Sequence, residues 1–364
     1  MKKKVLKGCL GVAGAAVLAI VVYVGYVFAT YYRLEDNLEI GVERSGQGAA
    51  CEVAEIGEHY LVVSANIGFG AYSDDYSFFM DGGEESRARS KEAVVENVSG
   101  SVGAAAGQNP DILLLQEVDT DGTRSWHVDE KEVIIRELAK HEMEDVDYTY
   151  AQNYDSPYLF YPVLQPHGSN KAGIVTVSVM EMSNGVRRSL PIEGGVMKFL
   201  DLDRCYSKQR IKTDNGKELV VYNLHLSAYT SDPSTATNQL LLLFDDMVDE
   251  YEKGNYVIGG GDFNKDLLGN SSDYFECGEL EDNWAQPIPE ELVPGEIQLV
   301  APLDESRPVP SCRNADSPYG EDSFVLTVDG FLASANVEVV EAEVVDTGFK
   351  WSDHNPVYME FILK

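Results

Sequence analysis

A series of short apolar runs, each ending in a polar residue, constrains the fold of this chain more than any other feature. Apolar runs of about four to eight residues bounded by turn-forming residues are typical of buried β-strands. They predict strands at 60–67, 111–116, 172–179, 218–226, 255–261, 324–333 and 351–362. Strands in this number require a partner layer, so the chain is expected to fold around sheets.

Helical stretches separate several of these strands. The clearest follows Pro233, where apolar residues recur every three or four positions from Leu240 to Tyr251. That spacing places them on one face of a helix. Two further helices are predicted at 86–106 and 130–141. Alternating strands and helices indicate an α/β layered architecture.

The charge balance of the 364-residue chain is strongly acidic, with a net charge of −33. With 44% apolar and 24% charged residues, the composition is that of a globular chain. An acidic surface repels polyanions, which argues against tight, sequence-independent binding to DNA or RNA. Solubility explains the acidity equally well, and we expect a monomer.

An uncharged stretch of 22 residues, from Gly8 to Ala29, lies near the N-terminus. At about 1.5 Å per residue it is long enough to cross a hydrocarbon core of about 30 Å. The lysines before it predict a single-pass cell-membrane protein with a cytoplasmic N-terminus and the bulk of the chain outside. The alternative is a signal peptide cleaved near Ala29, which would release a secreted protein.

The sequence predicts three parts. Residues 1–29 form the cytoplasmic lysines and the transmembrane anchor, 30–57 a juxtamembrane linker, and 58–364 the catalytic domain. Within that domain the proline-rich stretch 267–323 is predicted to be an irregular insertion. Outside the membrane a disulfide is permitted, and Cys277 and Cys312, near the ends of this stretch, are the favoured pair.

Carboxylates and amides end several of the apolar runs. Glu117 directly follows a buried run, and Asp262 and Asn264 follow three glycines, two residues apart. In an extended chain that spacing places both side chains on one side. A carboxylate at a strand end is suited to a hard cation such as Mg²⁺. Taken alone, Glu117 also fits a solvated strand end, and the Asp262 segment also fits a turn.

Two histidines complete the set of reactive groups. His225 lies in a predicted strand between two leucines, and Asp353-His354 stands shortly before the C-terminal residue. An imidazole can move protons near neutral pH. Taken alone, His225 is compatible with a structural strand residue, and Asp353-His354 with a turn into the last strand.

The order of these motifs resembles that of the endonuclease/exonuclease/phosphatase family, which includes deoxyribonucleases, sphingomyelinases and inositol-polyphosphate 5-phosphatases. The motifs are VVSANIGFG, DILLLQEVD, VVYNLHLSAY, YVIGGGDFN, VLTVDGFLAS and KWSDHNPVYMEF, from about His59 to the C-terminus. The resemblance implies a four-layer α/β sandwich, with two mixed sheets face to face between helices. It also implies a hydrolase of phosphate esters that uses Mg²⁺, with Mn²⁺ or Ca²⁺ as alternatives.

The resemblance also assigns roles. Glu117 would be the principal metal ligand, with Asn66 beside it and Asp353 completing the metal side. Asp262 would orient or activate the attacking water, and Asn264 would hold a phosphoryl oxygen. Asp329 would fix the tautomer of His354, which would act as base or stabilise the transition state. His225 would contact the phosphate or protonate the leaving oxygen. Arg313, in SerCysArg, would reach the substrate.

Three functions remain open. The chain is expected to be a phosphodiesterase acting outside the membrane, either a nuclease or an enzyme for phospholipid or sphingolipid headgroups. A bound cation inverts the local field, so the acidity does not exclude a nucleic-acid substrate. The anchor would place the site near lipid headgroups, and Tyr158, Phe160 and Tyr161 are candidates for an aromatic contact with lipid. The third function is a catalytically inactive binding module with the same fold.

Overall fold

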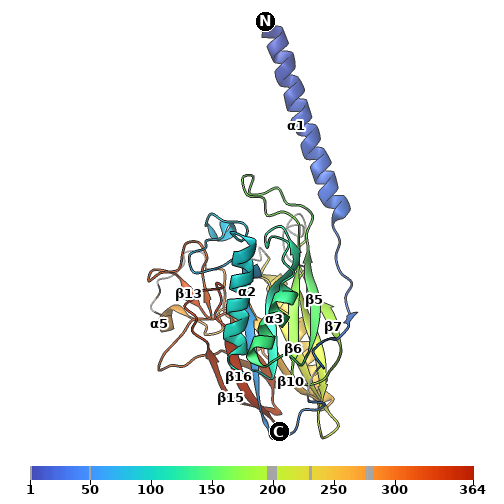
Figure 1. Ribbon diagram of the computed structural model, residues 1–364, viewed down its shortest axis with the longest axis vertical. Helices are drawn as coiled ribbons and strands as arrows, with labels where there is room; N and C mark the ends of the chain where they lie inside the picture. The colour runs from blue at the N-terminus through green and yellow to red at the C-terminus, as the bar shows by residue number, and fades with distance from the viewer. Residues whose placement is uncertain (1, 49–50, 195–202, 229–231, 276, 278–282) are drawn as a thin grey trace.

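Two mixed sheets of seven strands each lie face to face in the computed structural model, with helices on their outer faces (Figure 1). The structure describes residues 2–48, 51–194, 203–228, 232–275, 277 and 283–364. The four-layer α/β sandwich predicted from the sequence is therefore confirmed.

One sheet has its two parallel strands, β3 and β4, near the middle, and all its other neighbours are antiparallel. In spatial order its strands are β15 (Val337–Val344), β16 (Val357–Leu363), β3 (His59–Asn66), β4 (Ile112–Gly122), β6 (Asn170–Ser178), β5 (Val146–Asp155) and β2 (Glu43–Ser45).

The other sheet has the same plan, with β9 and β10 as its parallel pair. Its order is β1 (Leu38–Ile40), β7 (Met182–Ser189), β8 (Cys205–Lys212), β9 (Glu218–His225), β10 (Tyr256–Asp262), β14 (Asp329–Ser334) and β11 (Ile297–Val300). A two-stranded ribbon, β12 (Cys312–Arg313) with β13 (Val325–Leu326), lies outside both sheets.

Helices cover both outer faces. Against the first sheet lie α2 (Lys91–Ala106) and α3 (Glu130–Leu138), and against the second lies α4 (Pro233–Glu252). Each begins at a residue whose side chain accepts a backbone N–H, namely Ser90, Asp129 and Asp232. All three predicted helices are present. The shorter elements are η1 (Gly68–Gly70), η2 (Phe79–Asp81), η3 (Ala139–His141), α5 (Ser272–Phe275) and η5 (Glu290–Leu292).

The continuous apolar runs are explained by burial on both faces of each sheet. In β4, Leu114 belongs to the core between the sheets, whereas Leu113 contacts the core under α2 and α3. In β9, Val221 faces the core between the sheets and Val220 faces α4. Because side chains alternate along a strand, each central strand needs apolar residues at every position.

The N-terminal helix α1 (Lys2–Thr30) projects away from the sandwich (Figure 1). It is long and apolar enough to cross a membrane, and its most apolar part is not buried by the rest of the chain. Length and composition alone do not separate a membrane anchor from a signal sequence. The prediction of an apolar N-terminal helix is confirmed.

Several irregular segments contain more order than predicted. Within the predicted linker 30–57, β1 pairs with β7 and β2 with β5, so this segment contributes an edge strand to each sheet. Within 267–323, β11 pairs with β14. Glu276 and 278–282 of that stretch lie outside the described residues. These strands are short and partly exposed, so they lack the long apolar runs that identify the central strands.

Three predictions need correction. The predicted strand 324–333 is divided between β13 and β14, and in 351–362 only Val357 onward is in a strand. The favoured pair, Cys277 and Cys312, is not joined, and all five cysteines are free thiols in the structure. Cys277 contacts the carbonyl of Val325, while Cys312 lies beside His354, so the two buried thiols have different neighbours.

Candidate active site

The predicted site residues meet at one end of the sandwich. Asn66, His225 and Asp262 are the last residues of β3, β9 and β10, and Asp329 is the first residue of β14. In the sheet register, Asp262 stands beside His225 on one side and Asp329 on the other. Parallel strands end at the same edge, and an antiparallel neighbour begins there. The topology therefore gathers residues that are far apart in the sequence.

Glu117 reaches the site through an irregularity in β4. The register between β4 and β6 shifts between Leu115 and Val118, and Glu117 itself has a φ of 56°. A bulge of this kind re-aims a side chain. The Glu117 side chain remains 22% exposed, unlike the fully buried residues before it. Its carboxylate is thus available to a ligand.

Gly261 permits the close approach of β9 and β10 beside Asp262. Its φ is +148°, and a Cβ there would lie 2.0 Å from the carbonyl oxygen of Leu224. Only glycine adopts this conformation at low cost. The glycine run before Asp262 is therefore required by backbone geometry at this position.

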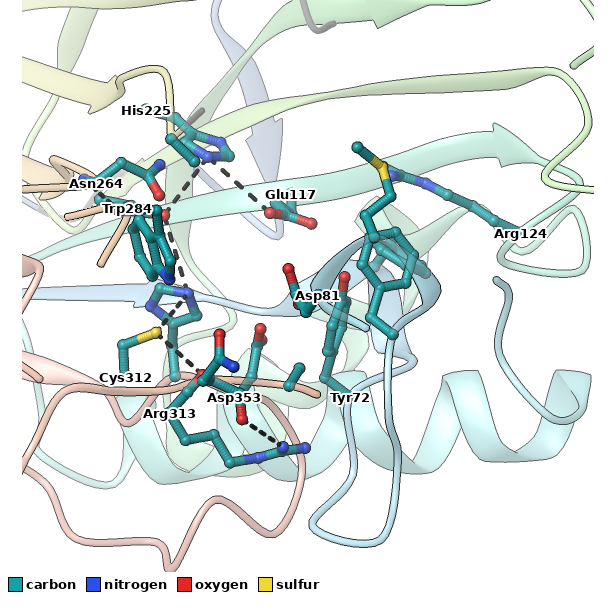
Figure 2. A pocket seen from close by; sticks show the side chains of 18 of the residues that line it. Tyr72, Asp81, Glu117, Arg124, His225, Asn264, Trp284, Cys312, Arg313 and Asp353 are labelled. Carbon is teal, nitrogen blue, oxygen red and sulfur yellow. Dashed lines mark hydrogen bonds and ion pairs between the residues drawn. The ribbon is translucent and has the colours of Figure 1, made fainter. Parts of the chain in front are cut away.

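A cavity of about 240 Å³ opens between these strand ends (Figure 2). Five carboxylates, three histidines and three arginines line it, together with aromatic residues. They are Asp81, Glu117, Glu193, Asp262, Asp353, His167, His225, His354, Arg124, Arg204, Arg313, Phe69, Tyr72, Phe78, Tyr154 and Trp284. Asn264 and Cys312 also line it, so most of the predicted site residues share one cavity.

His354 forms a buried pair with Asp329. Its Nδ1 lies 2.7 Å from Asp329 Oδ2, and the same oxygen accepts a hydrogen bond from Ser311 Oγ at 2.8 Å. Its Nε2 faces Asp262 Oδ2 at 3.9 Å. Burial disfavours the charged imidazole, but Asp329 and other nearby anionic groups outweigh it, so the pKa of His354 lies well above its ordinary value.

His225 approaches the same carboxylate without such a partner. Its Nε2 lies 3.5 Å from Asp262 Oδ2 and 4.0 Å from Glu117 Oε1. Its Nδ1 is buried and has no hydrogen-bond partner among the described residues. Burial, reinforced by the positive charge of Arg204, lowers the pKa of His225 well below its ordinary value. The ring is therefore neutral near pH 7.

The two predicted amides link the carboxylates. Asn66 Nδ2 donates to Glu117 Oε1 at 3.3 Å and to Asp262 Oδ2 at 3.1 Å. Asn264 donates its backbone N–H to Asp262 Oδ1 at 2.8 Å, and its side-chain amide donates to the Leu226 carbonyl. Asp262 is consequently held by both neighbours.

The oxygen donors in the cavity fit a hard divalent cation. Burial raises the pKa of Asp262 to about 7 and that of Asp353 to about 6, because both carboxyls lie in a site with too little positive charge. Glu117 and Asp353 offer carboxylate oxygens of the kind that Mg²⁺ prefers. Asn66 lies beside Glu117, and its Oδ1 accepts the backbone N–H of Gly68. Asp262, Asp329 and His354 also lie within 4.8 Å of one another, but the last two already satisfy each other.

The structure adds residues that the sequence did not indicate. Asp81, on η2, directs its carboxylate into the cavity together with Glu117 and Asp353 (Figure 2). Tyr72 and Trp284 also line the cavity. These residues lie outside the predicted strands and helices, so the polar residues that end the predicted strands did not include them.

Arg313 lines the cavity but is largely engaged elsewhere. Its guanidinium donates to the backbone carbonyls of Ser73, Tyr76, Asn314 and Ser317, and the side chain is buried. Arg313 therefore ties β12 to the loop after η1. The contact with substrate predicted for Arg313 remains a prediction.

The sequence model of the endonuclease/exonuclease/phosphatase family matches residues 63–354. The chain belongs to this family. The matched region runs from β3 to His354 and contains all eight predicted site residues. No curated protein sequence matches the chain.

Solved structures with the family fold resemble this chain at low sequence identity. An endonuclease/exonuclease/phosphatase from Beutenbergia cavernae has a TM-score of 0.54 and 17% identity, covering 84% of this chain and 72% of that one. ANGEL2, a 2′,3′-cyclic phosphatase, has a TM-score of 0.52 and 13% identity, covering 91% and 99%. A Bacteroides vulgatus family member has a TM-score of 0.50 and 12% identity, covering 84% and 100%. At these identities the likeness establishes the fold alone.

Proposed function

We propose that this protein is a metal-dependent phosphodiesterase that works at the outer face of a membrane. The observation that carries the proposal is the buried His354–Asp329 pair facing Asp262, in the cavity that Glu117 also lines. Enzymes of the family act on phosphate esters and generally depend on a divalent metal. A cavity that combines carboxylates with an oriented imidazole supports the same chemistry.

Glu117, Asn66 and Asp353 would hold the cation, which we propose is Mg²⁺. A cation held there would neutralise the phosphoryl oxygens and polarise the ester. Asp81 lines the same cavity and adds negative charge on that side. Mn²⁺ and Ca²⁺ take the same oxygen ligands and are the alternatives to test.

The chain's own residues would orient the water and move its proton. Asp262, fixed by Asn66 and Asn264, orients the attacking water. Asp329 holds the proton of His354 on Nδ1, so that Nε2 faces Asp262. The proton of the water passes to Asp262 Oδ2, or to His354 Nε2 when that imidazole is neutral. In its charged form, which Asp329 favours, His354 instead stabilises the transition state. We assign His225 to the phosphate or the leaving oxygen, and Asn264 to a phosphoryl oxygen.

In this proposal α1 anchors residues 58–364, the catalytic domain, outside the membrane. The lysines before the apolar run support a cytoplasmic N-terminus. The acidic chain disfavours a nucleic-acid polyanion as substrate and the anchor favours a headgroup, so the lipid substrate is the stronger candidate.

The test uses the full chain in detergent micelles with a chromogenic phosphodiester. We expect turnover with Mg²⁺, loss of turnover with a chelator, and a decrease of about a thousandfold for Glu117→Ala. Glu338→Ala, an exposed glutamate of β15, is the matched control and should retain full activity.

Thermal unfolding supplies a readout that does not depend on turnover. Mg²⁺ should raise the melting temperature of the wild type and of Glu338→Ala, but not that of Glu117→Ala. Turnover that is unchanged by the chelator would overturn the proposal. A Mg²⁺-dependent melting shift without turnover would support the binding module instead.

A further inference from the structure

The loop between β5 and β6 exposes a group of large apolar side chains. The exposed fraction is 57% for Phe160, 68% for Tyr161, 80% for Val163 and 99% for Leu164. Single exposed apolar residues are ordinary, but four within five positions indicate a surface that another phase or partner covers. Residues 156–168 also contain no Asp, Glu, Lys or Arg, although the chain has a net charge of −33.

This loop is bound to the C-terminal part of α1. The Tyr23 hydroxyl donates to the carbonyl of Tyr158 at 3.1 Å and accepts the N–H of Phe160 at 3.3 Å. The N–H of Tyr158 donates to the Tyr26 hydroxyl at 3.2 Å. The rings of Tyr23 and Phe160 meet edge to face, with centroids 5.2 Å apart.

These contacts fix the position of the loop along α1, and hence its depth relative to a membrane that α1 would cross. Tyr23 and Tyr26 lie six and three residues before Ala29, the end of the uncharged stretch. At about 1.5 Å per residue, they lie about 9 Å and about 5 Å inside that end. If α1 spans a bilayer, its tyrosines occupy the interfacial layer, where tyrosine is enriched. The loop that they bind must then lie at the same level.

The base of the same loop forms a wall of the catalytic cavity. Tyr154 and His167, on either side of it, line the cavity. The centroid of the Phe79 ring lies 5.6 Å from that of Tyr161 and 6.2 Å from that of His167. Phe79 belongs to η2, the same short helix that carries Asp81 into the cavity. In Figure 1 the loop rises, in green, from the end of the domain nearest α1.

We propose that residues 158–165, the interfacial loop, sit in the membrane interface beside α1 and hold the cavity mouth at the headgroups. The substrate is then a phosphodiester carried by a membrane lipid. This inference rests on the proposed function and on α1 spanning the membrane. A lipid surface is favoured over a protein partner because the loop lacks charge and is bound to the membrane helix itself.

The position of the loop can be measured without activity. The full chain carrying Leu164→Trp is placed in vesicles that contain brominated lipid, and its fluorescence is compared with that of the unsubstituted chain. We expect the added fluorescence to be quenched. Val340→Trp is the matched control, since Val340 is exposed on β15. Strand β15 lies at the end of the domain away from α1 (Figure 1). Equal quenching at both positions, or none at Leu164→Trp, would overturn the proposal.

Hydrolysis separates this proposal from the proposed function. The variant Val163→Asp/Leu164→Asp should lose at least about tenfold in rate on vesicles of phosphatidylcholine, phosphatidylglycerol and sphingomyelin, because burying one leucine-sized side chain is worth about a decade. Its rate on a soluble chromogenic phosphodiester should not change, and Val340→Asp should retain both rates.

Each outcome has a distinct meaning. A wild type that hydrolyses the soluble ester but none of the vesicle lipids contradicts the lipid substrate. Equal vesicle rates for the wild type and the double variant contradict the role of the loop. If the wild type hydrolyses no ester at all, the proposed function fails, while the quenching measurement still decides where the loop lies.

Discussion

His225 and His354 approach the same oxygen of Asp262, yet they stand in opposite electrostatic surroundings. Behind His354, the Asp329 carboxylate lies 2.7 Å from Nδ1. Behind His225, Nδ1 is buried without a partner among the described residues. The pKa is therefore raised at His354 and lowered at His225. The two histidines therefore differ in charge state because only His354 has a carboxylate bonded to its Nδ1.

The difference arises from the order of strands. Strand β14 lies beside β10 and begins with Asp329, so it supplies a carboxylate at the edge where His354 lies. Strand β9 has β8 on its other side, and Arg204, directly before β8, has the largest charge effect on His225. An anion behind an imidazole fixes its tautomer and favours its charged form, whereas a cation disfavours that form.

The comparison predicts that His354→Gln has the largest effect of these substitutions. Loss of a positioned group that transfers or stabilises a proton typically lowers the reaction rate by about a hundredfold to ten-thousandfold. We therefore expect a decrease of about a thousandfold in kcat. Steady-state kinetics with a soluble phosphodiester measures it, with circular dichroism as the control for folding. A decrease below tenfold would remove His354 from the chemistry.

Asp329→Asn should have the next largest effect. The amide keeps the shape but loses the charge that orients His354, and loss of such an orienting partner costs about tenfold to a hundredfold. The same substitution made in the His354→Gln protein should add little, since the two residues act as one unit. Additive losses in this double-mutant cycle would show that Asp329 acts independently of His354.

His225→Gln should reduce kcat only about tenfold. A neutral side chain contributes one hydrogen bond, worth about 1 kcal/mol or somewhat more when buried. The loss should be independent of Asp329→Asn, because Asp329 bonds the ring of His354 and not that of His225. If His225→Gln costs as much as His354→Gln, the distinction between the two histidines is wrong.

Cys312→Ala should have the smallest effect on turnover. The Sγ atom lies 3.6 Å from His354 Nε2, but burial raises the pKa of this thiol to about 12, so it is a neutral, weak partner. We expect less than about a twofold change in kcat, and a loss of about 1 kcal/mol in stability from the buried sulfur. Differential scanning calorimetry and kinetics measure the two. A large kinetic loss would make the thiol part of the site.

The sequence alone determined the central strands, the three main helices and the family. Buried strands flanked on both faces must be apolar at every position, as in Leu113 and Leu114, and such runs are visible in any sequence. The motif order then indicated the fold and eight site residues before any contact was known. Edge strands such as β1, β2 and β11 were not predicted, because they are partly exposed and need not be apolar at every position.

The differences between those residues come from the neighbours that the fold gives each of them. The bulge that turns Glu117 toward the cavity, the carboxylate behind His354 and the lack of one behind His225 depend on which strands are neighbours. Asp81 lines the cavity together with residues far from it in the chain. The interfacial loop likewise binds Tyr23, which lies far before it in the sequence. Local patterns mark what a residue can do, but electrostatics and burial are set by neighbours that the chain brings together only when it folds.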